Sequence, residues 1–145
     1  MNVREAEKND LSGILCLYTQ LHNNTIPNKG GKLGKLWEKI FDNDDYHLVV
    51  AEKDGRIISS CTICIIPNLT HEQRPYGLIE NVIASDEFEN KGAASACLDY
   101  AKKIALRENC YKILLMTGSK EESVLEFYRN AGYNSEDKTG FIQWI

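Results

Sequence analysis

The chain has 145 residues and a net charge of −4, with 43% hydrophobic and 26% charged side chains. We expect a single domain over residues 1–145, because this length and composition are those of one ordinary globular domain. The negative charge argues against nucleic acid or an anionic membrane as the main partner. Charged residues interrupt the N-terminal stretch, and no apolar run reaches the roughly 20 residues of a membrane-spanning helix. We therefore expect a cytoplasmic protein.

Cysteine and histidine are not arranged as metal ligands. The five cysteines are an odd number and lie in apolar segments, which is typical of free thiols in a reducing compartment. Cys61 and Cys64 fall within one predicted strand at a spacing that points their thiols to opposite faces. The histidines show no ligand spacing either, so we expect no metal.

The N-terminal half predicts a strand, two helices and a hairpin. Asn9 or Asp10 can cap the first helix, whose apolar residues repeat at helical spacing. A break rich in glycine and proline separates it from a second amphipathic helix. Asp54-Gly55 is a strong hairpin turn between two strand patterns. The predicted elements are a strand at 1–6, helices at 11–21 and 33–41, and strands at 46–52 and 56–66.

The C-terminal half predicts strands and helices in alternation. The strand at 111–117 is apolar on both faces, as a central strand of a sheet is. Ser119 and Glu122 form a capping box for the following helix, which Gly132 ends. The predicted elements are a strand at 77–84, a helix at 92–108, a strand at 111–117, a helix after 119, and final strands at 133 and 141–145.

This order of elements places an antiparallel first half before βαβ crossovers. We therefore expect an α/β (α+β) fold in which a mixed, mostly antiparallel sheet of about seven strands carries helices on both faces.

The turn into the helix at 92–108 is a candidate anion site. The free amides and the dipole at a helix N-terminus bind phosphate, and Gly92, Ala93 and Ala94 leave room for one. Ser95 could add a hydroxyl and Lys91 a positive charge. The alternative is that Gly92 only allows the chain to turn.

Two side chains could perform acid–base chemistry. Tyr128 precedes Gly132 near the end of the last helix and could donate a proton, although its apolar stripe also fits core packing. Glu80 interrupts an apolar strand, where burial would raise the pKa of its carboxyl toward the range useful for a general base. The alternatives for Glu80 are a solvated edge position or a structural pair with Arg74.

Two stretches, Glu89-Asn90-Lys91-Gly92-Ala93-Ala94 and Phe127-Tyr128-Arg129-Asn130-Ala131-Gly132-Tyr133, resemble the GNAT family of N-acetyltransferases. The order of elements extends the resemblance over essentially the whole chain. It implies the acyl-CoA N-acyltransferase fold, acetyl-coenzyme A as the acetyl donor, and direct attack by a primary amine within a ternary complex.

The resemblance also implies roles for individual residues. Tyr128 would protonate the coenzyme A sulfur, and Glu80 would lie in the substrate site as a base or a substrate ligand. The residues that it implies for cofactor binding are Val82, Ile83, Ala84, Glu89, Asn90, Lys91, Gly92, Ala93, Ala94 and Ser95. The first three would pair with the pantetheine arm, and the others would cradle the pyrophosphate.

This chain departs from the family pattern at three positions. Glu89 replaces the usual glutamine or arginine and brings a carboxylate close to phosphate, which puts cofactor affinity in question. Asp86 stands where proline is common, and Glu121 where many members carry asparagine.

Three segments together are similar to the glucosamine-6-phosphate N-acetyltransferase branch of the family: Gly77-Leu78-Ile79-Glu80-Asn81, Cys110-Tyr111-Lys112-Ile113, and the stretch from Phe127 to Tyr133. The acceptor is expected to be a small-molecule or peptide amine. A homodimer fits as well, because family members often pair. Two alternatives remain: a module that binds an acyl-coenzyme A without catalysis, and an unrelated α/β domain that binds a nucleotide at Gly92.

Overall fold

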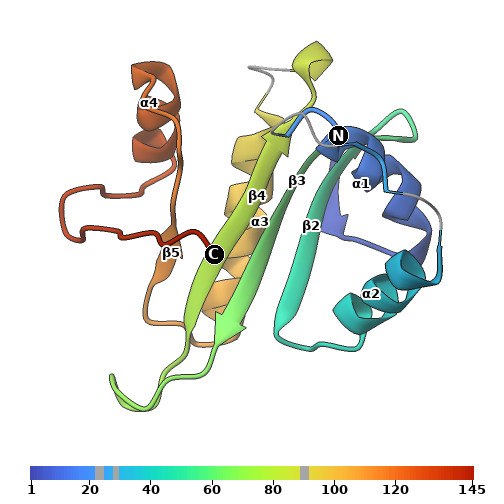
Figure 1. Cartoon of the computed structure of the whole chain (residues 1–145). Helices are drawn as coiled ribbons and strands as arrows, with labels where there is room; N and C mark the ends of the chain where they lie inside the picture. Colours follow the sequence, from blue (N-terminus) through green and yellow to red (C-terminus); the bar gives the residue numbers. More distant parts are fainter. Residues whose placement is uncertain (22–24, 28–29, 89–91) are drawn as a thin grey trace.

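The computed structural model describes residues 1–21, 25–27, 30–88 and 92–145 (Figure 1). Within these residues, five strands form one sheet in the order β1-β2-β3-β4-β5. The first three pairings are antiparallel and the pairing of β4 with β5 is parallel, so the sheet is mixed and mostly antiparallel, as expected. The strands are β1 (Asn2–Glu5), β2 (Tyr46–Lys53), β3 (Arg56–Ile66), β4 (Tyr76–Ala84) and β5 (Ile113–Leu115).

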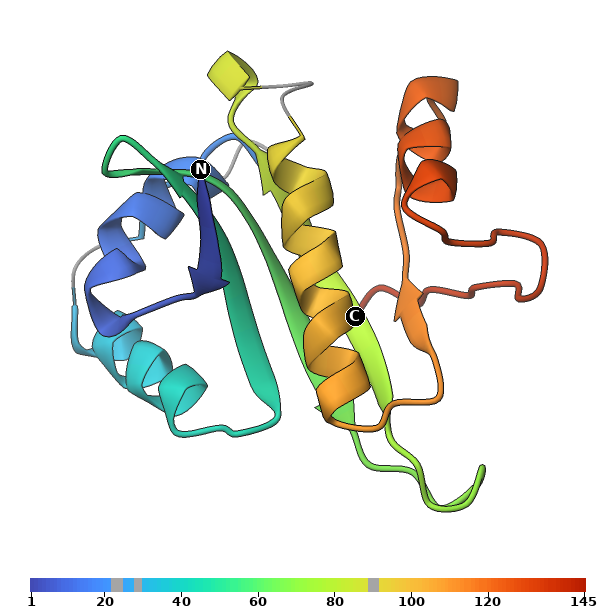
Figure 2. The same ribbon diagram turned by 180° about the vertical axis from the view of Figure 1, so that it is seen from behind.

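Helices cover both faces of the sheet, which confirms the layered arrangement (Figures 1 and 2). Along β2, Val49 and Ala51 pack with α3, whereas Leu48 and Val50 pack with α1 and α2. This alternation buries β2 on both faces, so the core consists of two apolar layers. The helices are α1 (Leu11–Tyr18), α2 (Gly31–Phe41), α3 (Ala93–Arg107) and α4 (Glu122–Asn130), with short 3-10 turns η1 (Lys8–Asp10) and η2 (Asp86–Phe88).

The expectation of about seven strands is wrong for the described residues, where the last two predicted strands are not formed. Phe141 is 91% exposed and Trp144 is 86% exposed, so this segment neither pairs with a sheet edge nor packs on an apolar face. A strand pattern becomes a strand only where a neighbouring edge accepts its hydrogen bonds.

The strand predicted at 111–117 is shorter in the structure than the sequence indicates. It shortens to Ile113–Leu115 and lies at the edge of the sheet, with its residues only half-buried. Its apolar composition indicated burial on both faces, but no strand pairs with its outer edge in the part of the chain that the structure describes.

The capping box predicted at Ser119 and Glu122 is not formed, because the helix begins later in the chain than the prediction requires. Helix α4 begins at Glu122, and its N-cap is Glu121. The Ser119 hydroxyl accepts the amide of Glu121 at 3.2 Å, so it orders the turn before the helix instead of capping the helix.

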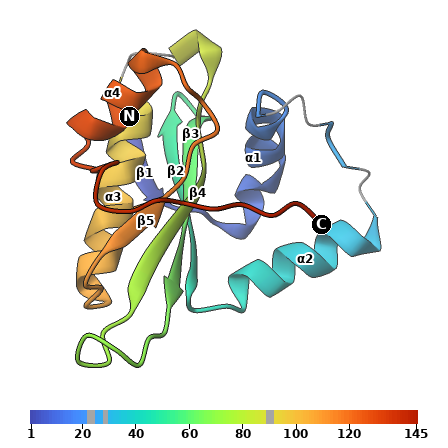
Figure 3. The same ribbon diagram turned by 60° about the vertical axis from the view of Figure 1, so that its left-hand side comes forward.

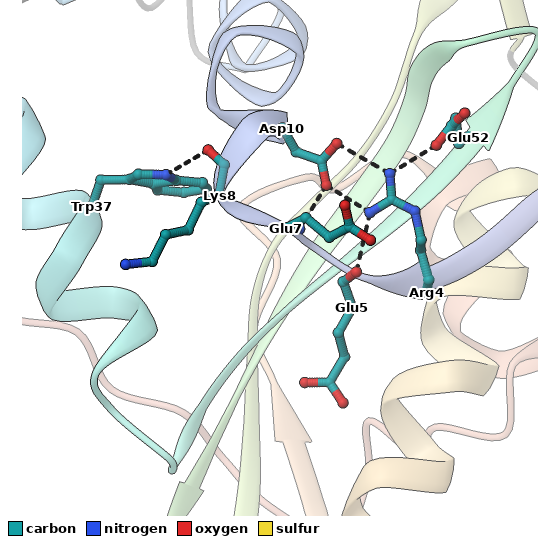
Figure 4. A network of polar contacts seen from close by, with 7 residues as sticks. All are labelled: Arg4, Glu5, Glu7, Lys8, Asp10, Trp37 and Glu52. Carbon is teal, nitrogen blue, oxygen red and sulfur yellow. Dashed lines mark hydrogen bonds and ion pairs between the residues drawn. The ribbon is translucent and has the colours of Figure 1, made fainter.

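A polar network ties the N-terminal elements to the sheet (Figure 4). The Arg4 guanidinium donates to both carboxylate oxygens of Asp10, at 2.6 and 3.1 Å, and to Glu52 on β2 at 2.7 Å. The indole of Trp37 donates to the carbonyl of Lys8 at 3.0 Å. Helices α1 and α2 are therefore anchored to β1 and β2 at the start of the chain.

Candidate active site

Strand β4 contains a β-bulge at its middle. Ser60 pairs with Ile83 and Thr62 with Glu80, so β4 carries one more residue than β3 over this stretch. Asn81, within the bulge, has a left-handed backbone with φ of 53°, a conformation that asparagine tolerates better than most residues. Such a bulge bends and twists its strand, and bulges are common beside active sites.

The bulge coincides with the point where β4 and β5 separate. Their parallel register runs from the pair Gly77 and Ile113 to the pair Ile79 and Leu115, and it ends immediately before Glu80. Beyond this point β4 continues to Ala84 and pairs only with β3 in the described residues. The backbone edge of residues 82–84 that faces away from β3 is therefore open, as a strand-like ligand would require.

The N-terminus of α3 follows β4 at its open end. Gly92 is the N-cap, with a left-handed backbone at φ 75°, and a Cβ placed there would meet no atom within 4 Å. Its backbone conformation, not crowding, is thus what requires glycine. The first helical bond runs from the Ala96 amide to the Gly92 carbonyl at 3.0 Å, so the amides of residues 93–95 precede any helical acceptor.

Three of the expected cofactor-binding residues, Glu89, Asn90 and Lys91, lie outside the described residues. Ser95 is exposed at the first turn of α3, whereas the small side chain of Ala93 is buried beneath it. The first turn of this helix therefore presents backbone amides and one hydroxyl to its surroundings.

Tyr128 is half-buried on α4, and its ring meets those of Phe127 and Tyr133 edge to face. Burial raises the pKa of Tyr128, and the nearby Cys61 thiol and Glu80 carboxyl raise it further. A raised pKa keeps the phenol protonated at neutral pH, so Tyr128 can donate a proton while it also packs against the core. Both interpretations of this residue are therefore compatible.

Glu80 is exposed, so the expectation of a buried carboxyl is wrong. The bulge interrupts the alternation of β4 and leaves Glu80 and Asn81 exposed in succession. The alternative pair with Arg74 is not formed either, because the Arg74 guanidinium donates to the carbonyls of Asn109 and Cys110. Glu80 instead lies close enough to Tyr128 for its charge to raise the pKa of that phenol.

Sequence reasoning missed a group of hydroxyls on the face of the sheet that α1 covers. The Tyr18 hydroxyl and Ser60 Oγ are buried and lie close to each other, but neither forms a hydrogen bond of good geometry with a described residue. Burial raises the pKa of Tyr18 to about 12, and the Ser60 hydroxyl partly opposes this effect. Ser60 pairs across the sheet with Val50, which faces α1 and α2, and Thr62 lies opposite Glu80. The run Ser59-Ser60-Cys61-Thr62 within an apolar strand was the available signal.

The described residues contain no group of histidine, cysteine, aspartate and glutamate side chains that could hold a metal ion. Within the same residues, no helix has the length and apolar character needed to cross a membrane. The candidate site therefore consists of the bulge of β4, its open edge, the first turn of α3, and the side chains of Tyr128 and Glu80.

Comparison with known protein families identifies the family to which this chain belongs. Residues 12–133 match the model of the acetyltransferase (GNAT) family. The chain belongs to the GNAT family. This membership confirms the resemblance.

Individual GNAT relatives agree with this assignment. A glucosamine 6-phosphate N-acetyltransferase of Trypanosoma brucei brucei is 29% identical over 84 residues, which are 58% of this chain and 55% of that protein. The match thus spans about half the length of the curated relative. A putative acetyltransferase from Agrobacterium tumefaciens aligns over 100% of both chains with a TM-score of 0.93 and 30% identity. The glucosamine-6-phosphate N-acetyltransferase of Arabidopsis thaliana, at 20% identity, shares the fold with a TM-score of 0.86 over 99% of this chain and 98% of its own.

Proposed function

We propose that this GNAT protein transfers an acetyl group from acetyl-coenzyme A to a primary amine by direct attack within a ternary complex. The observation that carries the proposal is that the β4 bulge coincides with the end of the β4–β5 register, next to Glu80. Each feature alone is common, but an unpaired strand edge beside a bulge does not stabilise the fold by itself, so a ligand that pairs with this edge is a reason for its presence.

The open strand edge and the first turn of α3 fit an extended donor that ends in phosphates. The backbone of Val82, Ile83 and Ala84 would pair with the pantetheine arm, as an added strand pairs with a sheet edge. The amides of Ala93, Ala94 and Ser95 point out of the N-terminus of α3 and would hold the pyrophosphate. Acetyl-coenzyme A supplies the thioester, and the residues of this chain position it.

Tyr128 and Glu80, near the point where β4 and β5 separate, would carry out the proton transfers. The amine nitrogen forms a bond to the acetyl carbon while the carbon–sulfur bond breaks, and Tyr128 gives its phenolic proton to the departing sulfur. The proton lost by the amine goes to Glu80, directly or through water. Because Glu80 is exposed, it could instead hold the incoming ammonium by its charge.

The acceptor that we favour is a small amino sugar. The curated relative named for glucosamine 6-phosphate matches a stretch of this chain, and the exposed carboxylate of Glu80 can attract an amine. We further propose a cytoplasmic setting, which suits the free cysteines, and a homodimer, which the exposed C-terminal residues support.

Thiol release from acetyl-coenzyme A, measured across amino sugars, polyamines, amino acids and peptides, tests the proposed function. We expect thiol release with at least one amino sugar, and a loss of most of this activity in Glu80→Gln. The melting temperature of that variant should not change, because Glu80 is exposed. Stabilisation by acetyl-coenzyme A without thiol release from any amine would refute the transferase and support the alternative, a module that binds an acyl-coenzyme A without catalysis.

A further inference from the structure

Three buried hydroxyls lie on β3 opposite the bulge of β4. Ser59 and Ser60 are 0% exposed, and Thr62 is 2% exposed. The Ser59 hydroxyl donates to the carbonyl of Ile83 at 2.7 Å, and the Thr62 hydroxyl donates to the carbonyl of Glu80 at 3.0 Å. Two hydroxyls therefore bind β4, one on each side of the bulge, whereas the Ser60 hydroxyl forms no hydrogen bond of good geometry with a described residue.

The two hydroxyls lie on opposite faces of the sheet. Residues that pair directly across antiparallel strands share a face. Ser59 pairs with Ala51, which packs with α3, and Thr62 pairs with Leu48, which packs with α1 and α2. Figure 3 shows α1 and α3 on opposite sides of β3 and β4. The bulge is therefore held from both faces of the sheet.

The bulge reverses the edge to which the backbone groups of β4 point. In a regular strand, the N–H and C=O groups of successive residues point to opposite edges. Before the bulge, the Gly77 amide donates to the carbonyl of Lys112, next to β5, at 3.0 Å. Beyond the bulge, the Ser85 amide donates to the carbonyl of Ile58 on β3 at 2.8 Å. Odd-numbered residues thus face β5 before the bulge and β3 after it.

This reversal decides which backbone groups reach the open edge of β4. The carbonyl of Ile83 points to β3, because it accepts the Ser59 hydroxyl. The N–H and C=O groups of Val82 and Ala84 therefore point away from β3, to the edge that β5 has left. An extended ligand at a strand edge bonds to every second residue, so these two residues are the ones available to it.

We propose that Ser59 and Thr62 are positioning residues for the acetyl donor, because their hydroxyls hold the reversed direction of β4 that turns Val82 and Ala84 toward the pantetheine arm. This role depends on the proposed function, since acetyl-coenzyme A is the molecule at the open edge. Neither hydroxyl contacts the donor, and each acts through a carbonyl of β4. A carbonyl that loses its buried donor is left unpaired, which favours a shift of the bulge along the strand.

Calorimetry with coenzyme A and the whole protein tests this role. Ser59→Ala and Thr62→Val each remove one hydroxyl with little change in side-chain volume, and each should raise the Kd about fivefold, as expected for one ordinary hydrogen bond. Ser60→Ala is the matched control, because it removes an equally buried hydroxyl from the same strand. Its Kd should stay within about twofold of wild type. Thr62→Ser keeps the hydroxyl and should restore most of the affinity.

A purely structural role predicts a different pattern. Loss of any of the three hydroxyls could lower the melting temperature, but the affinity of the folded protein for coenzyme A would then be the same in all three variants. Equal Kd values for Ser59→Ala, Thr62→Val and Ser60→Ala therefore overturn the proposal, even where the wild-type protein acetylates an amine. In an active enzyme, the KM for acetyl-coenzyme A should rise in the first two variants while the KM for the amine stays within about twofold.

Hydrogen exchange of the wild-type protein, resolved by residue and without ligand, tests the direction of β4 and needs no variant. The amides of Ile83 and Ser85 should exchange at least about tenfold more slowly than those of Val82 and Ala84, because only the first two point to β3. Equal rates overturn the proposal.

The same measurements separate this role from the proposed acetyl transfer. Binding of coenzyme A with the expected order of affinities, but without thiol release from any amine, refutes the transfer and supports the positioning role. Failure of the wild-type protein to bind coenzyme A refutes both.

Discussion

Substitution of Gly92 by valine should separate the cofactor role of this residue from its role in the turn. Gly92 and Gly55 have nearly the same left-handed backbone, at φ 75° and φ 74°, and a Cβ at either position meets no atom within 4 Å. Gly55 lies in the β2–β3 hairpin, and Gly92 is the N-cap of α3. Gly55→Val is therefore a control that carries the same backbone strain at a distance from the proposed cradle.

The strain should lower the stability of both variants to a similar extent. A β-branched residue in a left-handed conformation costs roughly 1–3 kcal/mol. At about 2–4 °C per kcal/mol, melting temperatures in the absence of ligand should fall by roughly 2–12 °C. This fall carries no information about the cofactor, because it follows from the shared backbone angle.

The increase in melting temperature on addition of acetyl-coenzyme A reports whether Gly92 contributes to cofactor binding. At a ligand concentration about 100-fold above Kd, binding stabilises the native state by about 2.7 kcal/mol. If the amides of residues 93–95 hold the pyrophosphate, the displaced first turn of Gly92→Val should weaken binding at least about tenfold, or 1.4 kcal/mol. Gly55→Val should keep the full ligand shift. Equal ligand shifts in the two variants would refute the cradle.

Three further predictions concern single side chains. Tyr128→Phe should lower kcat about 100-fold with little change in acetyl-coenzyme A binding. Tyr133→Phe, which removes a half-buried phenol from the same ring cluster, should leave kcat nearly unchanged, and equal kcat values in the two variants would remove the proposed acid. The hydrogen bond from Arg4 lowers the pKa of Asp10 from its ordinary value. The pair therefore stabilises the fold above about pH 4, and this stabilisation is lost as pH falls through the pKa of Asp10 in the native state. Asp10→Asn should therefore cost about 1 kcal/mol in denaturant melts at pH 7 and less at pH 3, and a constant difference would contradict the assignment. Native protein should react with a thiol reagent at exposed Cys16 well before Cys97, whose pKa burial raises to about 11, and early labelling of Cys97 seen by mass spectrometry would contradict the packing of α3.

Features that depend on local chemistry could be predicted from the sequence. The hairpin at Asp54-Gly55 is confirmed because both residues adopt positive φ, at 51° and 74°, which aspartate and glycine tolerate. The periodic helices and the mostly antiparallel sheet are confirmed for the same reason, since their apolar spacing is a property of the segments themselves.

The bulge on β4 could not be predicted from the pattern of the strand. It depends on the register between β3 and β4, which no single segment encodes. The exposure of Glu80 follows from that register, so a carboxyl that looked buried in the sequence is exposed in the structure. Asn81 was the one local signal, because asparagine is among the few residues that enter the left-handed region readily.

The remaining errors share a physical cause. β5 is shorter than its apolar pattern because the bulge ends its register with β4. The strand expected at 141–145 is missing because this segment does not run along an edge of the sheet in the described residues. The open edge of β4 beyond Ile79 has backbone groups suited to a partner that the chain alone does not supply, and the partner that we propose is the pantetheine arm. A strand edge left open within an otherwise paired sheet is therefore the place where we propose that a ligand completes this fold.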